Sequence, residues 1–306
     1  MENGGRRMKR AMAVQFIDLH VHTTASDGSD SPAEVVRRAV AARLAALAVT
    51  DHDTLSGLAE AEAEGRRLGL RVIRGCELSA SSEYGEIHLL GLWLPRQCPE
   101  LEARLRVLRE RRLERNAQIL ERLRELGMPL TLEDVREFSG GESMGRPHIA
   151  LAMKARGYVK DTREAMRTYL ARGCPAYVPK AAFAPEEAVT LLAGAGATVA
   201  FAHPMLLRCP PAWREALIQR LLPCGLHAIE AYHSEHSAAD ERTCVELAAR
   251  YNLSLTGGSD YHGITKPRIA VGRGKGGLRV TLAVLDRLLE QRRALGLPVD
   301  DEDGRD

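Results

Sequence analysis

The chain has 306 residues, 45% of them hydrophobic, with 43 Lys and Arg against 41 Asp and Glu, 10 His and 6 Cys. This length suffices for one large globular domain, or one domain with a smaller appendage, whose core needs neither disulfides nor metal for its stability. A formal net charge of +2 disfavours a broad, non-specific binder of nucleic acid or membranes, so we expect no duplex DNA binding and expect any anion to be held locally.

The first predicted strand is FIDLHVH, beginning at Phe16, whose residues alternate between apolar and polar types. Because successive side chains of a strand point to opposite faces, two sets of residues are expected on its two sides. The apolar set is Ile17, Leu19 and Val21, and the polar set is Asp18, His20 and His22. Two histidines are therefore expected to project together.

A helix, a strand and a second helix are predicted next. Ser31 and Pro32 supply an N-cap and a first-turn proline for a helix that extends to about Leu44. The run LAALAVT suits a strand buried on both faces, and a helix follows from about Ser56 to Leu68. LRVIRGCEL and EIHLLGLWL then predict a third and a fourth strand. The link between them is too short for a crossover helix, so this pair is expected to be antiparallel.

The segment from about Pro99 to Lys180 contains no convincing strand. Residues 100–127 are helical by composition, and Gly127 is a natural stop. The many arginines could suggest an RNA-binding helix, but interleaved glutamates favour a solvated amphipathic face. We interpret residues 99–180 as a helical insertion that forms a lid or a small second domain.

The alternation of helices and strands resumes after the insertion. Helices are predicted from Pro185, from about Pro211 and from about Ser237, each followed by a strand: TVAFAH, HAIEAYH and LSLTGG. Seven strands with interspersed helices predict an α/β fold, a closed or nearly closed barrel that is irregular at its third connection. Residues 14–98 and 181–290 would form this barrel, and residues 291–306 a C-terminal tail whose last eight residues, VDDEDGRD, are expected to be acidic and disordered.

Cysteine usage and the N-terminus indicate a cytoplasmic protein. No apolar run approaches the roughly 18–20 residues of a membrane span, and the N-terminal stretch has no adequate apolar segment or cleavage site for secretion. The six cysteines contain no CxxC pair, which argues against a zinc ribbon and a disulfide framework. We expect them to be reduced and buried as small hydrophobic side chains.

Polar residues recur where the predicted strands end, at His20, His22, Asp51, His52, Glu77, His203, Asp260 and His262, with His88 on the fourth strand. A single such residue is usually a hydrogen-bonded core histidine or a solvated acid, but the ends of parallel barrel strands converge on one face. Imidazole and carboxylate ligands together suit Mn, Fe and Zn, and their number exceeds one tetrahedral zinc. Two or three metals are indicated, and hydrolysis of a phosphate ester becomes the leading reaction class.

The motifs HVHTTASDG, VTDHDT, GCELS, EIHLLG, AFAHP and GGSDYHG, in this order, resemble the metal-binding motifs of the polymerase and histidinol phosphatase (PHP) family. The resemblance implies a distorted seven-stranded β/α barrel, a (β/α)7 barrel, with a trinuclear metal centre, most simply three Mn²⁺ with Fe²⁺ or Zn²⁺ as alternatives. It also implies a division of ligands: His20, His22, Glu77 and Asp260 for one metal; a bridging Glu77, His88 and His203 for a second; Asp27, His52 and His262 for a third.

Two acids near these motifs carry further expectations. Some PHP relatives have a histidine where this chain has Asp27, and a carboxylate there favours Mn²⁺ or Fe²⁺ over zinc. Asp51 precedes His52 and is either an orienting partner of that histidine or a structural cap. We favour the first, because a metal-bound histidine usually donates its other N–H to such a group.

Motifs in and after the insertion indicate a particular subgroup of this family. GRPHIA, KAAFAPEEAV and IEAYHSEHS closely resemble stand-alone bacterial PHP phosphoesterases that remove the 3′-phosphate from nucleoside 3′,5′-bisphosphates, a group also linked to 5′ to 3′ trimming of short RNA. Pro147 at a helix N1 position and the flanking Arg146 would make a phosphate cradle, with Arg146 the leading bidentate donor and His148 pointing into the same space. Candidates for a second cationic clamp are Lys180, His233 and Arg268, and those for stacking on a base are Tyr84, Tyr158 and Tyr232.

The hypothesis is in-line attack of hydroxide on phosphorus, with Asp260 among the catalytic residues and with His203, His233 or a water as the acid that protonates the leaving 3′-oxygen. Three alternatives stay open: a histidinol-phosphate phosphatase, a 5′ to 3′ exoribonuclease on short 5′-phosphorylated RNA, and a non-catalytic, metal-stabilised binding module. Loss of ligands would indicate the last, and each motif here retains its ligand.

Overall fold

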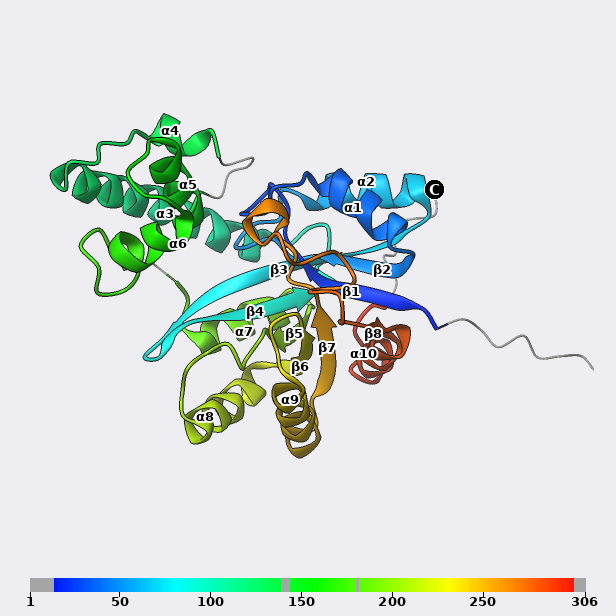
Figure 1. The fold of residues 1–306 in the computed structure, drawn as a ribbon. Coiled ribbons are helices and arrows are strands. Elements are labelled where there is room, and N and C mark those ends of the chain that lie inside the picture. The colour runs from blue at the N-terminus through cyan, green and yellow to red at the C-terminus, as the bar shows by residue number, and fades with distance from the viewer. Residues whose placement is uncertain (1–13, 139–143, 180–181, 300–306) are drawn as a thin grey trace, which may run out of the picture.

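The strands predicted from alternation form one curled sheet in the computed structural model, which describes residues 14–138, 144–179 and 182–299. The strand order β7-β6-β5-β4-β3-β2-β1-β8 makes a nearly closed barrel (Figure 1). Its strands are β1 (Phe16–Val21), β2 (Leu44–Val49), β3 (Arg71–Ser82), β4 (Gly85–Leu92), β5 (Thr198–Phe201), β6 (Leu226–His233), β7 (Ser254–Gly258) and β8 (Val280–Thr281). The predicted α/β barrel is confirmed.

Strand directions confirm the irregular connection. β1, β2 and β3 are parallel, as are β5, β6 and β7, but β4 is antiparallel to both β3 and β5. β3 and β4 form a long hairpin in which Ser82 pairs with Gly85 at the tip. The seam between β1 and β7 closes beyond the strand ends, where Val21 bridges to Tyr261 and the Asp260 N–H donates to the His20 carbonyl at 2.8 Å.

The simple alternation predicted for β1 is only partly correct. Ile17 and Leu19 belong to the hydrophobic cluster inside the barrel, whereas Val21 packs with Val35 and Val36 of the first helix. The pairing of β1 with β2 shifts between Asp18 and Val21, so the apolar positions no longer face one side. The same shift occurs at the part of the strand that carries His20.

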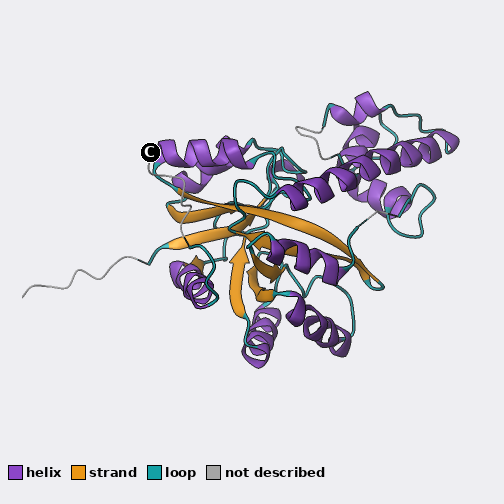
Figure 2. Ribbon diagram, turned by 180° about the vertical axis from the view of Figure 1, so that it is seen from behind, coloured by secondary structure: helices purple, strands orange, loops and turns teal. Residues whose placement is uncertain are grey.

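Six helices surround the barrel (Figure 2): α1 (Pro32–Ala41), α2 (Leu58–Leu68), α7 (Pro185–Gly194), α8 (Pro211–Leu221), α9 (Ala238–Tyr251) and α10 (Leu282–Ala294), with 3₁₀ turns η2 (Leu222–Cys224) and η3 (Gly263–Thr265). The Ser31 side chain accepts from the Glu34 N–H at 3.2 Å, as its capping role predicts. α1 ends at Ala41, earlier than expected, because Arg43 adopts a left-handed φ of 58° and Leu44 already begins β2.

The sequence analysis missed β8 and α10. β8 has two residues, too few to show alternation, but α10 is an amphipathic helix whose Leu285 and Leu288 complete the interior of the barrel. α10 extends to Ala294, so the barrel does not end at residue 290 as the predicted boundary had it. The acidic end, residues 300–306, lies outside the described residues.

The insertion is helical, with α3 (Pro99–Glu125), α4 (Leu132–Arg136), α5 (Arg146–Ala155), α6 (Thr162–Ala165) and a π-helical turn, η1 (Met166–Leu170). The 27-residue α3 is about 40 Å long at 1.5 Å per residue. Its Leu101 and Leu105 pack into a barrel cluster, whereas Ile119 and Leu123 belong to a separate cluster drawn from residues 119–178. One long helix thus joins the barrel to a second apolar core, which lies beside the barrel above the β3–β4 hairpin (Figure 1).

No helix in the described ranges is both long and apolar enough to cross a membrane. All six cysteines are free; Cys76, Cys98 and Cys244 are buried, and the other three are partly exposed.

Candidate metal centre

All nine predicted metal ligands come together at one end of the barrel. Their ligand atoms form four overlapping groups, in each of which the atoms lie within 4.8 Å of one another. The groups are His22, Asp27, His52 and His262; His20, Glu77 and His203; His20, His22 and Asp260; and His52, Glu77 and His88. Because the residues come from the loops and strands at the carboxyl ends of β1, β2, β3, β5 and β7, and from β4, the barrel itself assembles the cluster.

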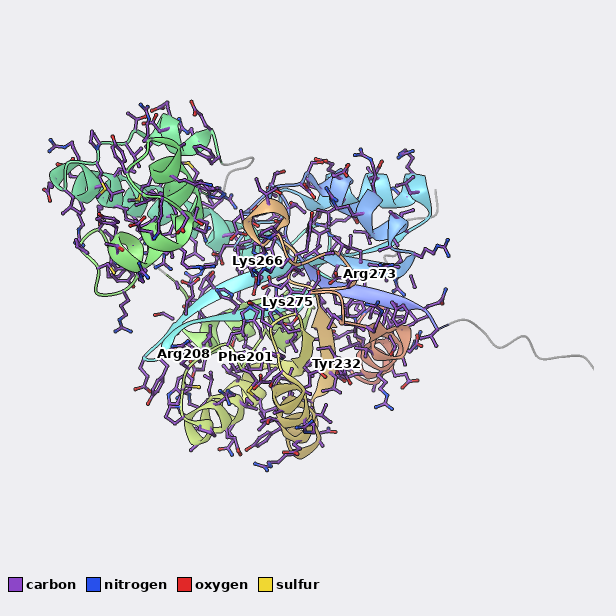
Figure 3. The ribbon with its side chains drawn as sticks, in the orientation of Figure 1. Phe201, Arg208, Tyr232, Lys266, Arg273 and Lys275 are labelled. Atoms are coloured by element: carbon purple, nitrogen blue, oxygen red, sulfur yellow. The ribbon has the colours of Figure 1, made fainter. Side chains whose placement is uncertain are left out.

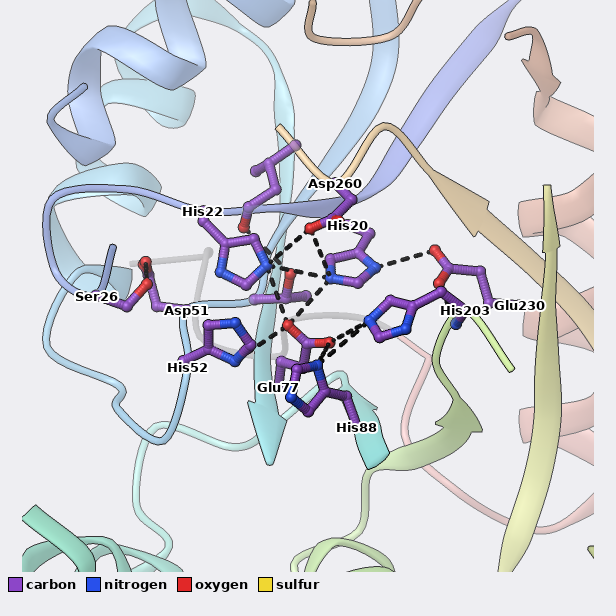
Figure 4. A network of polar contacts seen from close by, with 12 residues as sticks. His20, His22, Ser26, Asp51, His52, Glu77, His88, His203, Glu230 and Asp260 are labelled. Atoms are coloured by element: carbon purple, nitrogen blue, oxygen red, sulfur yellow. Dashed lines mark hydrogen bonds and ion pairs between the residues drawn. The ribbon is translucent and has the colours of Figure 1, made fainter. Parts of the chain in front are cut away.

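Glu77 is the centre of this cluster (Figure 4). Its Oε2 lies 3.2 Å from His20 Nε2, 3.1 Å from His22 Nε2 and 3.2 Å from His52 Nδ1. Its Oε1 lies 3.0 Å from both His88 Nδ1 and His203 Nε2. A single buried carboxylate thus faces five imidazoles, which is the arrangement a bridging ligand needs.

The donors present fit divalent cations. His22 Nδ1, His52 Nδ1 and Glu77 Oε2 are buried and make no hydrogen bond, although buried polar atoms in proteins are nearly always paired. A cation among them would supply the missing partner. Nitrogen and carboxylate oxygen donors without sulfur suit Mn, Fe and Zn.

The carboxylates and imidazoles of the cluster strongly shift one another's pKa values. Burial would raise the pKa of Glu77, but His52, His20 and the other imidazoles hold it well below its usual range. Burial would lower the pKa of His22, but Asp260 and Glu77 raise it to about 9; Glu77 likewise raises the pKa of His88 to about 10 against the effect of burial. Burial lowers the pKa of His52 to about 3. Without metal, the cluster therefore holds protons on some of its ligands.

Metal loading is expected to release protons at pH 7.5. His22 and His88 are protonated there in the metal-free protein, since their pKa values lie above that pH, and a ligand imidazole must be neutral. Apparent affinity for Mn²⁺ should therefore rise with pH up to about 10, the pKa of His88. Calorimetric titration of Mn²⁺ in buffers of different ionisation enthalpy measures the proton count. A binding enthalpy independent of the buffer contradicts this expectation.

Glu230 was not among the site residues predicted from the sequence, yet it contacts both His20 and His203. It is fully buried on β6; its Oε1 contacts His20 Nδ1 at 3.0 Å, and its Oε2 accepts the His203 N–H at 2.7 Å. The second bond fixes a backbone in which His203 has a φ of 27°. The sequence does contain one indication of this role, an acidic residue inside the apolar strand HAIEAYH, because a buried carboxylate needs polar or charged partners.

Replacement of Glu230 by Gln is expected to lower metal affinity or turnover about 10- to 100-fold, as is typical for a residue that orients a metal-bound histidine. The matched control is Glu215→Gln, a partly exposed carboxylate on α8 that pairs with Arg250. Metal titration followed by calorimetry measures the change. Equal affinities for Glu230→Gln and wild type would show that Glu230 does not orient the site.

Asp51 does not orient His52 as expected. Its carboxylate accepts from the Thr23 N–H at 2.8 Å, the Thr23 hydroxyl at 2.7 Å and the Ser26 hydroxyl at 2.6 Å. It therefore fixes the turn that leads to Asp27, which is a structural role. The sequence could not show this, because the partners are 25 to 28 residues away.

Asp260 is held from several directions. Its φ is 54°, and its Oδ1 lies 3.4 Å from His22 Nε2, toward the cluster. Its Oδ2 faces His233 Nε2 at 3.2 Å and Lys266 Nζ at 2.5 Å. His233 Nδ1 also accepts the Glu235 N–H, so both of its ring nitrogens are used. This arrangement suits His233 for positioning Asp260, and it places Lys266, which the sequence analysis did not single out, at the edge of the cluster.

A cleft joins the cluster to the insertion. It is lined by Ser26, Asp27, His52, Glu86, Arg112, Arg115, Gly145, Arg146 and Pro147. Arg112 pairs with the buried Asp53, and Arg115 donates to the Val178 carbonyl while its Nη2 is buried without a partner. Burial and the neighbouring Arg146 lower the pKa of Arg115 to about 10. Three guanidinium groups thus converge on the Asp27 and His52 side of the cluster.

The other predicted substrate contacts are placed as follows. Arg146 is the first residue of α5 and lines the cleft, with Pro147 one position further into the helix than expected. His148 is buried, and its Nδ1 accepts the Gly145 N–H at 3.0 Å, so it serves the helix cap and is not among the residues that line the cleft. Arg268 is exposed, and Lys180 lies outside the described residues.

Comparison with known proteins identifies the class. The family model described as "PHP domain" matches residues 18–172. The chain therefore belongs to the PHP-domain family.

Three relatives cover most of the chain. It is 37% identical over 247 residues to a 3′,5′-nucleoside bisphosphate phosphatase of Chromobacterium violaceum, covering 80% of this chain and 87% of the relative. It is 36% identical to a phosphoribosyl 1,2-cyclic phosphate 1,2-diphosphodiesterase of Eggerthella lenta, with 80% and 94% covered. It is 34% identical to the 5′-3′ exoribonuclease Rnm of Escherichia coli, with 80% and 84% covered. All three names designate hydrolysis of phosphate esters.

Solved structures give the same fold. A chain from Bifidobacterium adolescentis described as a metal-dependent phosphoesterase superposes with a TM-score of 0.81 at 28% identity, covering 90% of this chain and 96% of that one. An amidohydrolase from Chromobacterium violaceum, with bound sulfate and no metal, superposes with a TM-score of 0.80 at 34% identity and the same coverage.

Proposed function

We propose that this protein is a metal-dependent phosphoesterase that removes the 3′-phosphate from nucleoside 3′,5′-bisphosphates. The observation that carries the proposal is the cleft in which three arginines face one side of a nine-residue His and carboxylate cluster. Such a cleft offers two anion sites, one at the cluster and one at the guanidinium groups. A substrate with two phosphates on one ribose matches that pair of sites.

The cluster would hold three cations, with Mn²⁺ the best match to its donors. His20, His22, Glu77 and Asp260 would bind one, Glu77, His88 and His203 a second, and Asp27, His52 and His262 a third. The 3.3 Å approach of His88 Nδ1 to His203 Nε2, both beside Glu77 Oε1, supports the second set. Divalent cations supply charge stabilisation for the phosphoryl oxygens and hydroxide near neutral pH.

The remaining roles belong to residues of the chain. Arg115 and Arg146 bind the 5′-phosphate and so orient the 3′-phosphate toward the cluster. His203 and Asp260 hold the reacting end of the site. His233 keeps a proton on Nε2 against Asp260 Oδ2 and fixes that carboxylate, and Lys266 adds a positive charge beside the phosphoryl group. The insertion, residues 99–180, acts as a lid because it contributes the arginines.

The test is phosphate release by the Mn²⁺-reconstituted protein from a panel of substrates. The panel contains adenosine 3′,5′-bisphosphate, histidinol phosphate and a ribose 1,2-cyclic phosphate, the last two representing other chemistries of the family. We expect kcat/KM to be at least about tenfold higher for the bisphosphate, the difference that one charge-assisted contact of about 1.4 kcal/mol or more produces. An equal or higher value for either of the others contradicts the proposal.

A further inference from the structure

An aromatic pair lies at the tip of the β3–β4 hairpin, outside the cleft. The rings of Tyr84 and Trp213 meet edge to face, with centroids 4.9 Å apart, and 40% of Tyr84 is exposed. Trp213 Nε1 donates to Glu83 Oε1 at 2.6 Å, which ties the start of α8 to the hairpin. Of the tyrosines considered for base stacking, Tyr84 alone is placed here: Tyr158 donates to the Pro129 carbonyl within the insertion, and Tyr232 lines a groove between α9 and α10.

Two arginines flank the aromatic pair. Arg172 of the insertion donates to the Glu83 carbonyl at 3.5 Å and is exposed. Arg208 is also exposed and follows Leu207, whose side chain lies 3.7 Å from the position of a Cβ at Gly85 in the hairpin turn. Figure 3 shows Arg208 near the tip of the hairpin, apart from Lys266 at the metal cluster. Aromatic rings with cations beside them are how proteins bind single-stranded nucleic acid without reading its sequence.

Each member of the aromatic pair lies near a cluster residue along the chain. Tyr84 is in the turn of the hairpin that carries His88, and Trp213 is in the first turn of α8, which follows the segment that carries His203. Tyr84 is four positions before His88, about 13 Å along a strand. Neither Tyr84 nor Trp213 is among the residues that line the cleft, so the pair lies outside the site proposed for a mononucleotide.

We infer that Tyr84, Trp213, Arg172 and Arg208 form a second binding surface, which holds the downstream nucleotides of a single-stranded RNA whose 5′-terminal nucleotide occupies the cleft. The inference rests on the proposed function, because the terminal nucleotide uses the same phosphate sites. The terminal nucleotide would place its 5′-phosphate at the arginines of the insertion and its 3′-phosphoester at the cluster. The next nucleotide would then extend past His88 and His203. Hydrolysis of that diester forms a bond between the water oxygen and phosphorus and breaks the bond between phosphorus and the 3′-oxygen, which takes up a proton. The terminal nucleotide leaves as a nucleoside 5′-monophosphate, and the shortened RNA keeps the phosphate on its new 5′ end.

The test compares Tyr84→Ala with the matched Tyr84→Phe on adenosine 3′,5′-bisphosphate and on a 5′-phosphorylated RNA of about five nucleotides. Loss of one base–aromatic stack should raise KM for the RNA about 5- to 100-fold and leave the bisphosphate constants within about twofold. Tyr84→Phe, which keeps the ring, should behave as wild type. Equal effects on the two substrates, or an unchanged KM for the RNA, overturn the inference.

A binding measurement separates this inference from the proposed function. Anisotropy of a labelled RNA with metal-chelated protein needs no catalysis, and Arg208→Ala should reduce the slope of log affinity against log salt by about 0.7. A protein that hydrolyses the bisphosphate but does not bind the RNA overturns only the inference. A protein that hydrolyses neither substrate, yet binds the RNA in a Tyr84-dependent way, overturns only the proposed function.

Discussion

Replacement of Glu77 by Gln is expected to reduce phosphate release from a nucleoside 3′,5′-bisphosphate at least about a thousandfold, because metal ions supply several kcal/mol of transition-state stabilisation. The glutamate lies within 3.2 Å of five imidazoles, so its charge is shared by more of the cluster than that of Asp27 or Asp260. Gln keeps the shape but loses the charge, and its amide nitrogen cannot act as a ligand. His20→Ala and Asp260→Ala should also abolish hydrolysis.

The matched control for Glu77→Gln is Glu235→Gln, an exposed carboxylate that pairs with Lys275 outside the cluster. Both variants should keep the circular dichroism of the wild type, and elemental analysis should show a loss of bound metal in Glu77→Gln alone. Wild-type turnover of Glu77→Gln or Asp260→Ala under added Mn²⁺ would remove the basis for the ligand assignment.

Replacement of Arg146 by Ala should raise KM for a bisphosphate about 10- to 100-fold, corresponding to the loss of a hydrogen bond to a charged group, and leave KM for an aryl phosphate unchanged. Arg146 lines the cleft at the start of α5, where its guanidinium lies 5.8 Å from the Tyr177 ring centroid and donates to the Leu170 carbonyl at 3.2 Å. These contacts hold the side chain in place, so little entropy is lost when a phosphate binds. Arg146→Lys should recover only part of the affinity, because an ammonium cannot bind a phosphate in the bidentate way.

Arg156→Ala is the control for this prediction. Arg156 is the residue at the other end of the same helix and pairs with Asp134 on the surface. Its replacement should change neither constant. Equal increases of KM for the bisphosphate and the aryl phosphate in Arg146→Ala would show that the cleft does not recognise a second phosphate.

The sequence predicted the barrel and the residues of the cluster because both leave local patterns. Apolar strands such as LAALAVT are recognisable from a few neighbouring residues, and His20, His52 and Glu77 follow or end such strands. The carboxyl ends of parallel strands meet at one end of a barrel, so the parallel order of these strands is enough to bring the three residues together. β8 left no such pattern, and the shift in β1 depends on its pairing with β2.

Residues that support the cluster could not be found in this way. Glu230 is 210 residues from His20, and Arg112 and Arg115 resemble the other arginines of an amphipathic helix until the insertion folds over the barrel. Arg115 faces inward because Val178 accepts its Nε–H, a contact 63 residues away. Long-range partners of this kind distinguish a buried arginine from a solvated one, and composition does not record them.

Comparison of kcat/KM for adenosine 3′,5′-bisphosphate and for adenosine 3′-monophosphate, with the Mn²⁺-loaded protein, tests the central claim most directly. Both substrates present the same ester to the metal cluster, and only the first presents a second phosphate to Arg115 and Arg146. We predict a value at least about tenfold higher for the bisphosphate, consistent with one or more charge-assisted hydrogen bonds. Equal values, or no hydrolysis of either substrate by fully loaded protein, would contradict the account.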